Sequence, residues 1–244
     1  MTDNPTSAPP FVRDWFATIS SIAMAELVPE PEHAAFFSAD MINGFVHFGP
    51  LASPRVNALV DPVVSLFFRG WEHGIREFVL LQDTHQPDSP EFRAYPPHAL
   101  VGTDESATIP EIAGLPFAEA LTVIEKRSLG PAVETSFDAW WDEHPDLTRA
   151  IVVGDCTDLC VYQLAMHLRM RANALGLADF EVIVPVNVVD TFDIPAGDDT
   201  EIGQAHPAQF FHEVFLYHMA SNGIRIVSEI TSEGEDIFRG VVAP

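Results

Sequence analysis

Basic residues are scarce in this sequence of 244 residues. Lysine and arginine together number 12, against 36 aspartate and glutamate residues, which gives a formal net charge of -24. A chain of this charge is repelled by phosphate backbones and by anionic lipid, so we expect neither nucleic acid nor a membrane surface as its partner. The acidic excess favours solubility and indicates little about a reaction.

Long apolar runs and cysteines are also lacking. No apolar run approaches the ~20 residues that a membrane span requires. The N-terminal sequence MTDNPTSAPP has neither the basic start nor the apolar centre of a signal peptide. Cys156 and Cys160 are the only cysteines, and such scarcity is typical of a reducing compartment. We therefore expect a cytoplasmic protein in which a retained thiol has a chemical role.

Apolar residues, in contrast, are abundant enough for a large core. They make up 47% of the chain and include 18 phenylalanines, which excludes a disordered or coiled-coil protein. Strands are predicted over residues 34–39, 76–81, 121–124, 150–153, 180–184 and 224–227. Helices are predicted over residues 54–73, 136–144, 158–175 and near 207–221. This alternation predicts a three-layer α-β-α sandwich with a mainly parallel central sheet of about six strands.

The beginning of the chain is interpreted as an addition to this domain. A near-helical apolar pattern predicts an amphipathic helix over residues 11–27 that buries Phe11, Trp15 and Ile19. Such a helix packs on the main body or on another subunit. A homo-oligomer is therefore one of two alternatives that the sequence leaves. We assign residues 1–31 to an N-terminal tail and helix, and residues 32–244 to a hydrolase domain.

Charged and reactive residues follow four of the predicted strands. They are Asp40, Asp83, Lys126 and the turn 154–160. In a parallel sheet, ligands bind beyond the carboxyl ends of the strands. We therefore expect these residues to line one site.

Cys160 lies in the first turn of a predicted helix. The unpaired N–H groups and the dipole of a helix N-terminus favour a thiolate, and a nearby ammonium would lower the thiol pKa further. Backbone N–H groups of the turn could stabilise an oxyanion. Alternatively, Cys160 is a small buried hydrophobic residue, the usual fate of a free cysteine.

Asp40 and Lys126 have residue types that suit a nucleophilic mechanism. Lys126 is the only lysine, and lysine is a compact charge whose pKa can be tuned. Asp40 could take the thiol proton and later give it to a leaving group. Each also has an ordinary explanation, a turn cap for Asp40 and compositional bias for Lys126. Together with Cys160 they indicate a hydrolase.

A group of metal-ligating residue types follows the second predicted strand. Asp83 and His85 are two positions apart on an extended segment, which turns both side chains to the same side. His98 follows two prolines that present its ring on a rigid backbone, and Glu91 lies between. This mixed nitrogen and oxygen set suits zinc, iron or manganese. Ordinary loop histidines are the alternative, which we accept for His47, His73, His144 and His167.

The run Gly154-Asp155-Cys156-Thr157-Asp158-Leu159-Cys160-Val161 resembles the G-x-A-T-D-x-C-V signature of the isochorismatase-like cysteine hydrolases. The resemblance, which extends over residues 34–229, implies that Cys160 is the nucleophile. It also implies a cis peptide bond between Asp155 and Cys156, and an oxyanion hole formed by the amides of Cys156 and Cys160. Asp40 and Lys126 match the family's catalytic acid and lysine. The chain differs in having Cys156 where the family has alanine.

Asp83-x-His85 together with Tyr95-Pro96-Pro97-His98 resembles the metal site of the nicotinamidases, the metal-containing branch of that family. The usual tryptophan of the first motif is replaced by Thr84. This second resemblance implies one divalent metal ion, zinc, iron or manganese, on Asp83, His85, His98 and Glu91. It also places Tyr95 against the ring of the substrate. Phe45 joins it there, because the segment from Asp40 to Phe45 resembles the family's D-x-Q-N-D-F segment, with Phe45 on its aromatic position.

The activity that these resemblances imply is a metal-assisted conversion of nicotinamide to nicotinate and ammonia through a thioester. This activity would place the protein in NAD salvage and pyridine nucleotide biosynthesis, with a small molecule as its partner. Three alternatives remain open at this point. They are a related amidase for another small carboxamide or N-carbamoyl compound, a non-catalytic binding module, and a metal hydrolase in which Cys160 is only structural.

Overall fold

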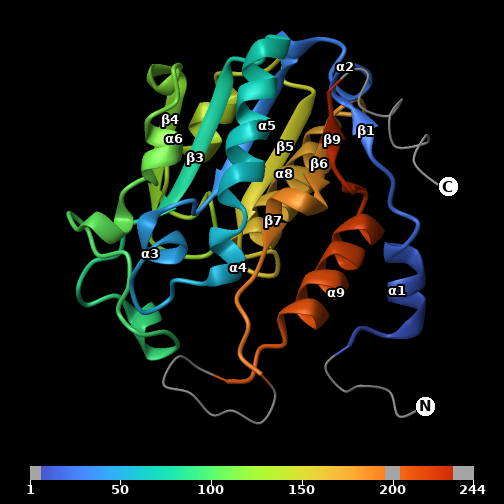
Figure 1. Ribbon diagram of the computed structural model, residues 1–244. Helices are drawn as coiled ribbons and strands as arrows, with labels where there is room; N and C mark the ends of the chain where they lie inside the picture. The colour runs from blue at the N-terminus through green and yellow to red at the C-terminus, as the bar shows by residue number, and fades with distance from the viewer. Residues whose placement is uncertain (1–6, 196–203, 233–244) are drawn as a thin grey trace, which may run out of the picture.

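The computed structural model describes residues 7–195 and 204–232 (Figure 1). Within these ranges the central sheet has seven strands in the order β4-β3-β2-β5-β6-β8, with β7 beside β5, and every pairing is parallel. The strands are β2 (Ala34–Ala39), β3 (Glu77–Asp83), β4 (Leu121–Lys126), β5 (Arg149–Asp155), β6 (Glu181–Pro185), β7 (Val189–Asp190) and β8 (Arg225–Val227).

Helices cover both faces of this sheet, with α5 in front and α8 behind in Figure 1. One apolar cluster joins the sheet to α2 (Met24–Leu27), α5 (Val60–His73) and α6 (Pro110–Ala113). The other joins it to α7 (Phe137–Asp142), α8 (Cys160–Leu175) and α9 (Ala208–Ser221). The three-layer α-β-α fold predicted from the sequence is confirmed, and the six predicted strands are all present. The seventh strand, β7, is too short to leave a periodic signal.

The central strands are apolar on both sides because helices cover both sides. All six residues of β2 are buried. Phe36 of β2 stacks on Phe78 of β3 at a centroid distance of 5.3 Å and meets Phe67 of α5 at 5.2 Å. Such aromatic contacts fix the helix layer against the sheet. The middle of the sheet is therefore a rigid support for whatever follows its strands.

The N-terminal segment differs from its prediction. Instead of one helix over residues 11–27, it forms α1 (Pro10–Phe16), β1 (Ile22–Ala23) and α2. The helix is interrupted because β1 leaves it to pair in parallel with β9 (Ile230–Thr231). Residues 1–6 of the predicted tail lie outside the described residues, as do 196–203 and 233–244 of the predicted domain.

Helix α1 packs on the main body through edge-to-face contacts between aromatic rings. Trp15 and Phe11 meet the ring of Tyr217 on α9 at centroid distances of 5.2 and 5.5 Å. Phe11 is nevertheless 59% exposed, so the prediction that it is buried was wrong, and Val12 is the residue that α1 buries. Helix α1 lies beside α9 at the edge of the molecule in Figure 1.

Several short elements connect the main ones. The predicted helix over residues 54–73 is divided into α4 (Pro54–Asn57) and α5. Short elements that were not predicted are α3 (Asn43–Val46) and single helical turns over Pro31–His33, Pro90–Arg93, Asp104–Ser106, Ala118–Ala120 and Val186–Val188. Among the described residues, no helix has the length and apolarity needed to cross a bilayer.

Gly154 allows two neighbouring strand ends to approach closely. Its φ is +105°, and a Cβ added to it would lie 2.0 Å from the carbonyl oxygen of Ala39. Only glycine fits such a contact in the left-handed region. As a result, the residue that follows β2, Asp40, lies next to the turn that follows β5.

We expect Gly154→Ala to lower the free energy of unfolding by about 2–5 kcal/mol, because the methyl group adds steric overlap to left-handed strain. Gly176→Ala is the matched control, since Gly176 has a φ of +71° but open space around its Cβ position. The control should lose only about 1–2 kcal/mol. Denaturant unfolding measures both, and equal losses would contradict the close approach at Gly154.

Candidate active site

Four buried side chains meet beyond the carboxyl ends of the central strands. Asp40 follows β2, Asp83 is the last residue of β3, Lys126 is the last residue of β4, and Cys160 is the first residue of α8. Asp83 and Lys126 are partners in the β3–β4 register. The structure thus brings together the acid, the lysine and the thiol that the sequence singled out.

Lys126 joins the other three. Its Nζ lies 2.7 Å from Oδ2 of Asp40, 2.6 Å from Oδ1 of Asp83 and 3.4 Å from Sγ of Cys160. Asp40 is held from its other oxygen, because Oδ1 accepts a 2.8 Å hydrogen bond from the Asp83 amide. The lysine is 1% exposed. A buried ammonium with two carboxylate partners is fixed in position, since losing either would leave a buried charge unpaired.

The backbone of Asp40 is itself unusual. Its φ is +54°, the left-handed region, although it is not glycine. Such a conformation costs on the order of 1–3 kcal/mol and persists only where the surroundings enforce it. Here the Asp40 amide donates to the Leu81 carbonyl at 2.9 Å, and the Ile42 amide donates to the Asp40 carbonyl at 2.7 Å. The strained turn directs the carboxylate of Asp40 toward Lys126.

Burial and mutual charge shift the pKa values of this group. Burial raises the pKa of Asp40 to about 6; the Asp83 carboxylate adds to the rise and Lys126 opposes it. Burial would lower the pKa of Lys126, but the two carboxylates outweigh it and hold that pKa well above its ordinary value. Burial would raise the pKa of Asp83, but Lys126 and His85 together lower it. Lys126 and Asp83 are therefore charged, and Asp40 is a proton acceptor stronger than an ordinary carboxylate.

Cys160 differs from the sequence-based expectation of a resting thiolate. Burial, followed by the carboxylate of Asp40, raises its thiol pKa well above the ordinary value, and Lys126 opposes this only in part. The sulfur lies within 4.8 Å of a carboxylate oxygen of Asp40. The expectation was wrong because two carboxylates lie beside the same ammonium. Cys160 is therefore a neutral thiol that lies beside a carboxylate able to accept its proton.

The turn before α8 contains the second cysteine. The peptide bond between Asp155 and Cys156 is cis, as the resemblance implied. Cys156 and Cys160 are both free thiols. The carbonyl of Cys156 accepts from the amides of Leu159 and Val161 at 3.0 and 3.1 Å. At the start of a helix the first amides have no partner within the helix, so the turn can offer N–H groups to an anion.

The four metal-ligating candidates also converge. One ligand atom from each of Asp83, His85, Glu91 and His98 lies within 4.8 Å of the others. Nε2 of His85 is 3.5 Å from Oδ2 of Asp83, and Nε2 of His98 is 3.9 Å from the same oxygen. Asp83 thus faces Lys126 with one carboxylate oxygen and both imidazoles with the other.

The two histidines have ring nitrogens that are available to ligate a cation. Both ring nitrogens of His85 are buried and have no hydrogen-bond partner, an arrangement that costs about 1–3 kcal/mol per group unless a ligand satisfies it. Nδ1 of His98 lies 2.8 Å from the carbonyl of Pro96, which fixes its proton there and leaves Nε2 with a lone pair. The residues therefore fit a divalent metal ion with mixed nitrogen and oxygen ligands.

A largely apolar cavity opens beside these groups. Phe45 and Tyr95 line it, with ring centroids 5.5 and 6.3 Å from that of His98. The sequence did not single out six further lining residues as members of the site: Leu51, Val56, Leu129, Asp155, Leu159 and Phe192. Asp155, at the end of β5, could have been suspected from its position, and burial raises its pKa well above the ordinary value. Phe192 has no signal in the sequence, since it reaches the cavity from a segment after β7.

Comparisons with known proteins agree on one family. A model described as "Isochorismatase domain" matches residues 34–214. Nicotinamidase 1 of Arabidopsis thaliana is 30% identical over 208 residues, which cover 80% of this chain and 85% of that protein.

Solved structures show the same fold. A nicotinamidase from Bacillus subtilis has a TM-score of 0.63 at 24% identity and covers 80% of this chain and 99% of its own. A pyrazinamidase of Pyrococcus horikoshii in complex with zinc has a TM-score of 0.62 at 21% identity, covering 80% and 98%.

The metal cluster can be tested without any substrate. We expect His85→Ala to weaken divalent-metal binding by more than about tenfold, since it removes a ligand and not only an outer partner. The control is His47→Ala, because His47 lies outside the cluster with Nε2 3.0 Å from Glu111. Metal analysis after dialysis against zinc, iron or manganese gives the result. Equal metal content in both variants and the unaltered protein would contradict the assignment.

Proposed function

The chain belongs to the isochorismatase domain family, and on that premise we propose that it is a cysteine amidohydrolase that converts nicotinamide to nicotinate and ammonia. One observation carries the proposal: Lys126 contacts Asp40, Asp83 and Cys160 at once. A nucleophile, a base and the candidate metal cluster thereby share one centre. The name of the Arabidopsis relative supports nicotinamide as the substrate.

The reaction begins with a proton transfer from Cys160 to Asp40. The thiol is neutral at rest and lies within 4.8 Å of the carboxylate of Asp40, whose pKa burial raises to about 6. As Sγ forms a bond to the carboxamide carbon, its proton moves to Asp40. Lys126 stays charged and stabilises the anionic sulfur as it loses that proton.

Collapse of the tetrahedral intermediate gives a thioester. The amides of Cys156 and Cys160 stabilise the oxyanion in the meantime, a contribution of about 10²–10³ in rate per donor in comparable sites. The C–N bond then breaks, and Asp40 returns its proton to the leaving nitrogen, which departs as ammonia. Water next gives a proton to Asp40 and attacks the thioester carbon. The C–S bond breaks, Sγ regains the proton, and nicotinate leaves.

The substrate ring binds between Phe45 and Tyr95 in the apolar cavity. Asp83, His85, Glu91 and His98 would hold the divalent metal, zinc, iron or manganese. When bound, such an ion would supply a Lewis acid for the ring nitrogen, which would fix the orientation of the carboxamide. Asp83 links the two halves of the site because it also contacts Lys126.

The wider setting is part of the same proposal. We place the protein in the cytoplasm, in NAD salvage and pyridine nucleotide biosynthesis, with no nucleic-acid or membrane partner. Residues 1–31 are an addition to a hydrolase domain over residues 32–244, and α1 provides a surface for a homo-oligomer. The nearest alternative activity is that of a related cysteine amidase for another small carboxamide or an N-carbamoyl compound.

Cys160→Ala should lower the rate of ammonia release from nicotinamide by at least about 10³-fold, because it removes the thiol that lies beside Lys126 and Asp40. Cys156→Ala is the matched control and should keep most of the activity, since alanine is the family's usual residue there. Nicotinamide, pyrazinamide and N-carbamoyl compounds are compared in one assay. Turnover retained in Cys160→Ala but abolished by a chelator would replace the cysteine mechanism with a metal hydrolase.

A further inference from the structure

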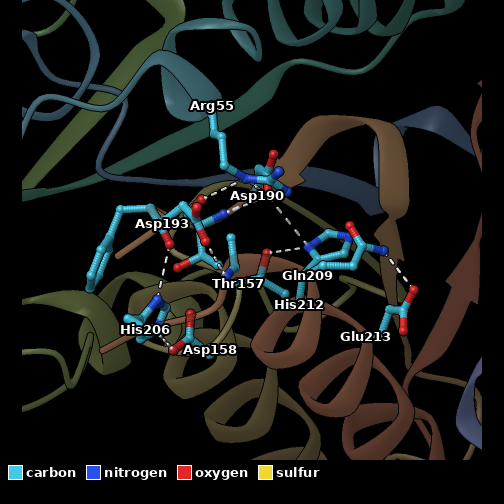
Figure 2. Close-up of polar contacts among 12 residues, drawn as sticks. Arg55, Thr157, Asp158, Asp190, Asp193, His206, Gln209, His212 and Glu213 are labelled. Atoms are coloured by element: carbon cyan, nitrogen blue, oxygen red, sulfur yellow. Dashed lines mark hydrogen bonds and ion pairs between the residues drawn. The ribbon is translucent and has the colours of Figure 1, made fainter. Parts of the chain in front are cut away.

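A histidine outside the catalytic group contacts the cavity wall. His206 precedes α9, and Figure 2 shows it against Asp158, beside the segment that bears Asp193. That segment, residues 191–195, follows β7 and is called the strap below. Its Phe192 lines the cavity together with Cys156 and Cys160. No motif in the sequence singles out His206, and the mechanism above does not use it.

Both ring nitrogens of His206 face oxygens that accept hydrogen bonds. Nε2 lies 2.7 Å from Oδ2 of Asp158, and Nδ1 lies 2.9 Å from the carbonyl oxygen of Phe192. A carbonyl and an ionised carboxylate can only accept, so each nitrogen must carry a proton. The geometry therefore requires an imidazolium that bridges the catalytic turn, through Asp158, to the strap, through Phe192.

Stacking and backbone pairing make this bridge rigid. The His206 ring lies parallel between two phenylalanines, at centroid distances of 4.1 Å from Phe192 and 4.2 Å from Phe211. A cation between aromatic faces gains further stabilisation. Its backbone also pairs with Ile194 through two hydrogen bonds, of 2.7 and 2.9 Å. Phe192 cannot move from the cavity wall without disturbing the His206 ring.

The charged groups around His206 also favour its protonated form. Burial would lower the pKa of His206, but the bond to Asp158 outweighs it and raises that pKa. The remaining titratable groups nearby have other described partners. Asp193 accepts from the Ala208 amide, Asp190 is bonded to Arg55, His212 is bonded to Thr157, and Cys156 lies on the cavity side. Asp158 is thus the carboxylate that holds the charge on His206.

We propose that His206 is a positioning residue whose imidazolium holds Phe192 in place as a wall of the substrate cavity. The identity of the substrate rests on the function proposed above, whereas the charged bridge does not. Neutral His206 has one lone pair facing an oxygen, which loosens either Asp158 or the strap. Binding of an aromatic substrate then weakens, while Lys126, Asp40 and Asp83, which do not contact His206, keep their mutual contacts.

The direction of the pH effect follows from the raised pKa. The bridge is complete below the pKa of His206 in the folded protein and is lost as pH rises through it. We expect KM to rise about three- to tenfold across that range with little change in kcat, as for the loss of one aromatic contact. His206→Gln should have the high KM at every pH and lose this part of the profile.

His218→Gln is the matched control, because His218 is an exposed histidine of α9 that contacts Tyr162 and Asn222 away from the cavity. Its KM profile should equal that of the unaltered protein. If His206→Gln keeps the normal KM profile, or if its loss is entirely in kcat, the positioning role is wrong.

A spectroscopic titration tests the bridge without any substrate. The NMR signal of the His206 ring, assigned by its absence in His206→Gln or from backbone connectivity, should titrate with a pKa above the ~6.5 of a free histidine. Asp158→Asn should bring that pKa down to this value or below it. An unshifted pKa in the unaltered protein would overturn the proposal. If the titration succeeds and nicotinamide is not hydrolysed, only the proposed function fails.

Discussion

The site depends on one buried ammonium that two carboxylates share. Lys126 neutralises charges that Asp40 and Asp83 could not otherwise keep in a medium without water. Coulomb energies at such distances are large, so a displacement of any partner would leave a charge uncompensated. This single contact therefore fixes the distance between the thiol and the candidate metal cluster. It also explains why the thiol is protonated. Lys126 carries one positive charge and already faces two carboxylates, so a thiolate would add a third negative charge to the site.

Sheet order is what makes the contact possible. Strands β4 and β3 end in Lys126 and Asp83, and the neighbouring strands β2 and β5 lead to Asp40 and to the turn before Cys160. Neighbouring parallel strands lie about 4.8 Å apart, so four successive strand ends fall within reach of one small molecule. Residues more than a hundred positions apart become neighbours because crossover helices return each strand in the same direction.

Local patterns were sufficient for the main strands and for the residues that meet around Lys126. Continuous apolar runs followed by a charged residue located Asp40, Asp83 and Lys126 at strand ends, and the structure places them there. Features created by distant contacts left no local pattern. The break between α1 and α2 goes with the pairing of β1 with β9, and Phe192 is stacked on His206, fourteen positions further along the chain. The ionisation state of Cys160 was beyond sequence reasoning too, because it depends on how three charges share one space.

The pairing of β1 with β9 joins the beginning of the described chain to its end. Ile22 lies opposite Ile230, so segments near the two ends of the described chain hold each other. A contact between such remote positions forms only after the sheet between them has assembled, since the entropy of closing so large a loop must first be offset. The two-stranded sheet of β1 and β9 therefore forms late in folding, after the core has assembled. Local loss of the β1–β9 pairing would release the segment after α1 while leaving the arrangement around Lys126 intact.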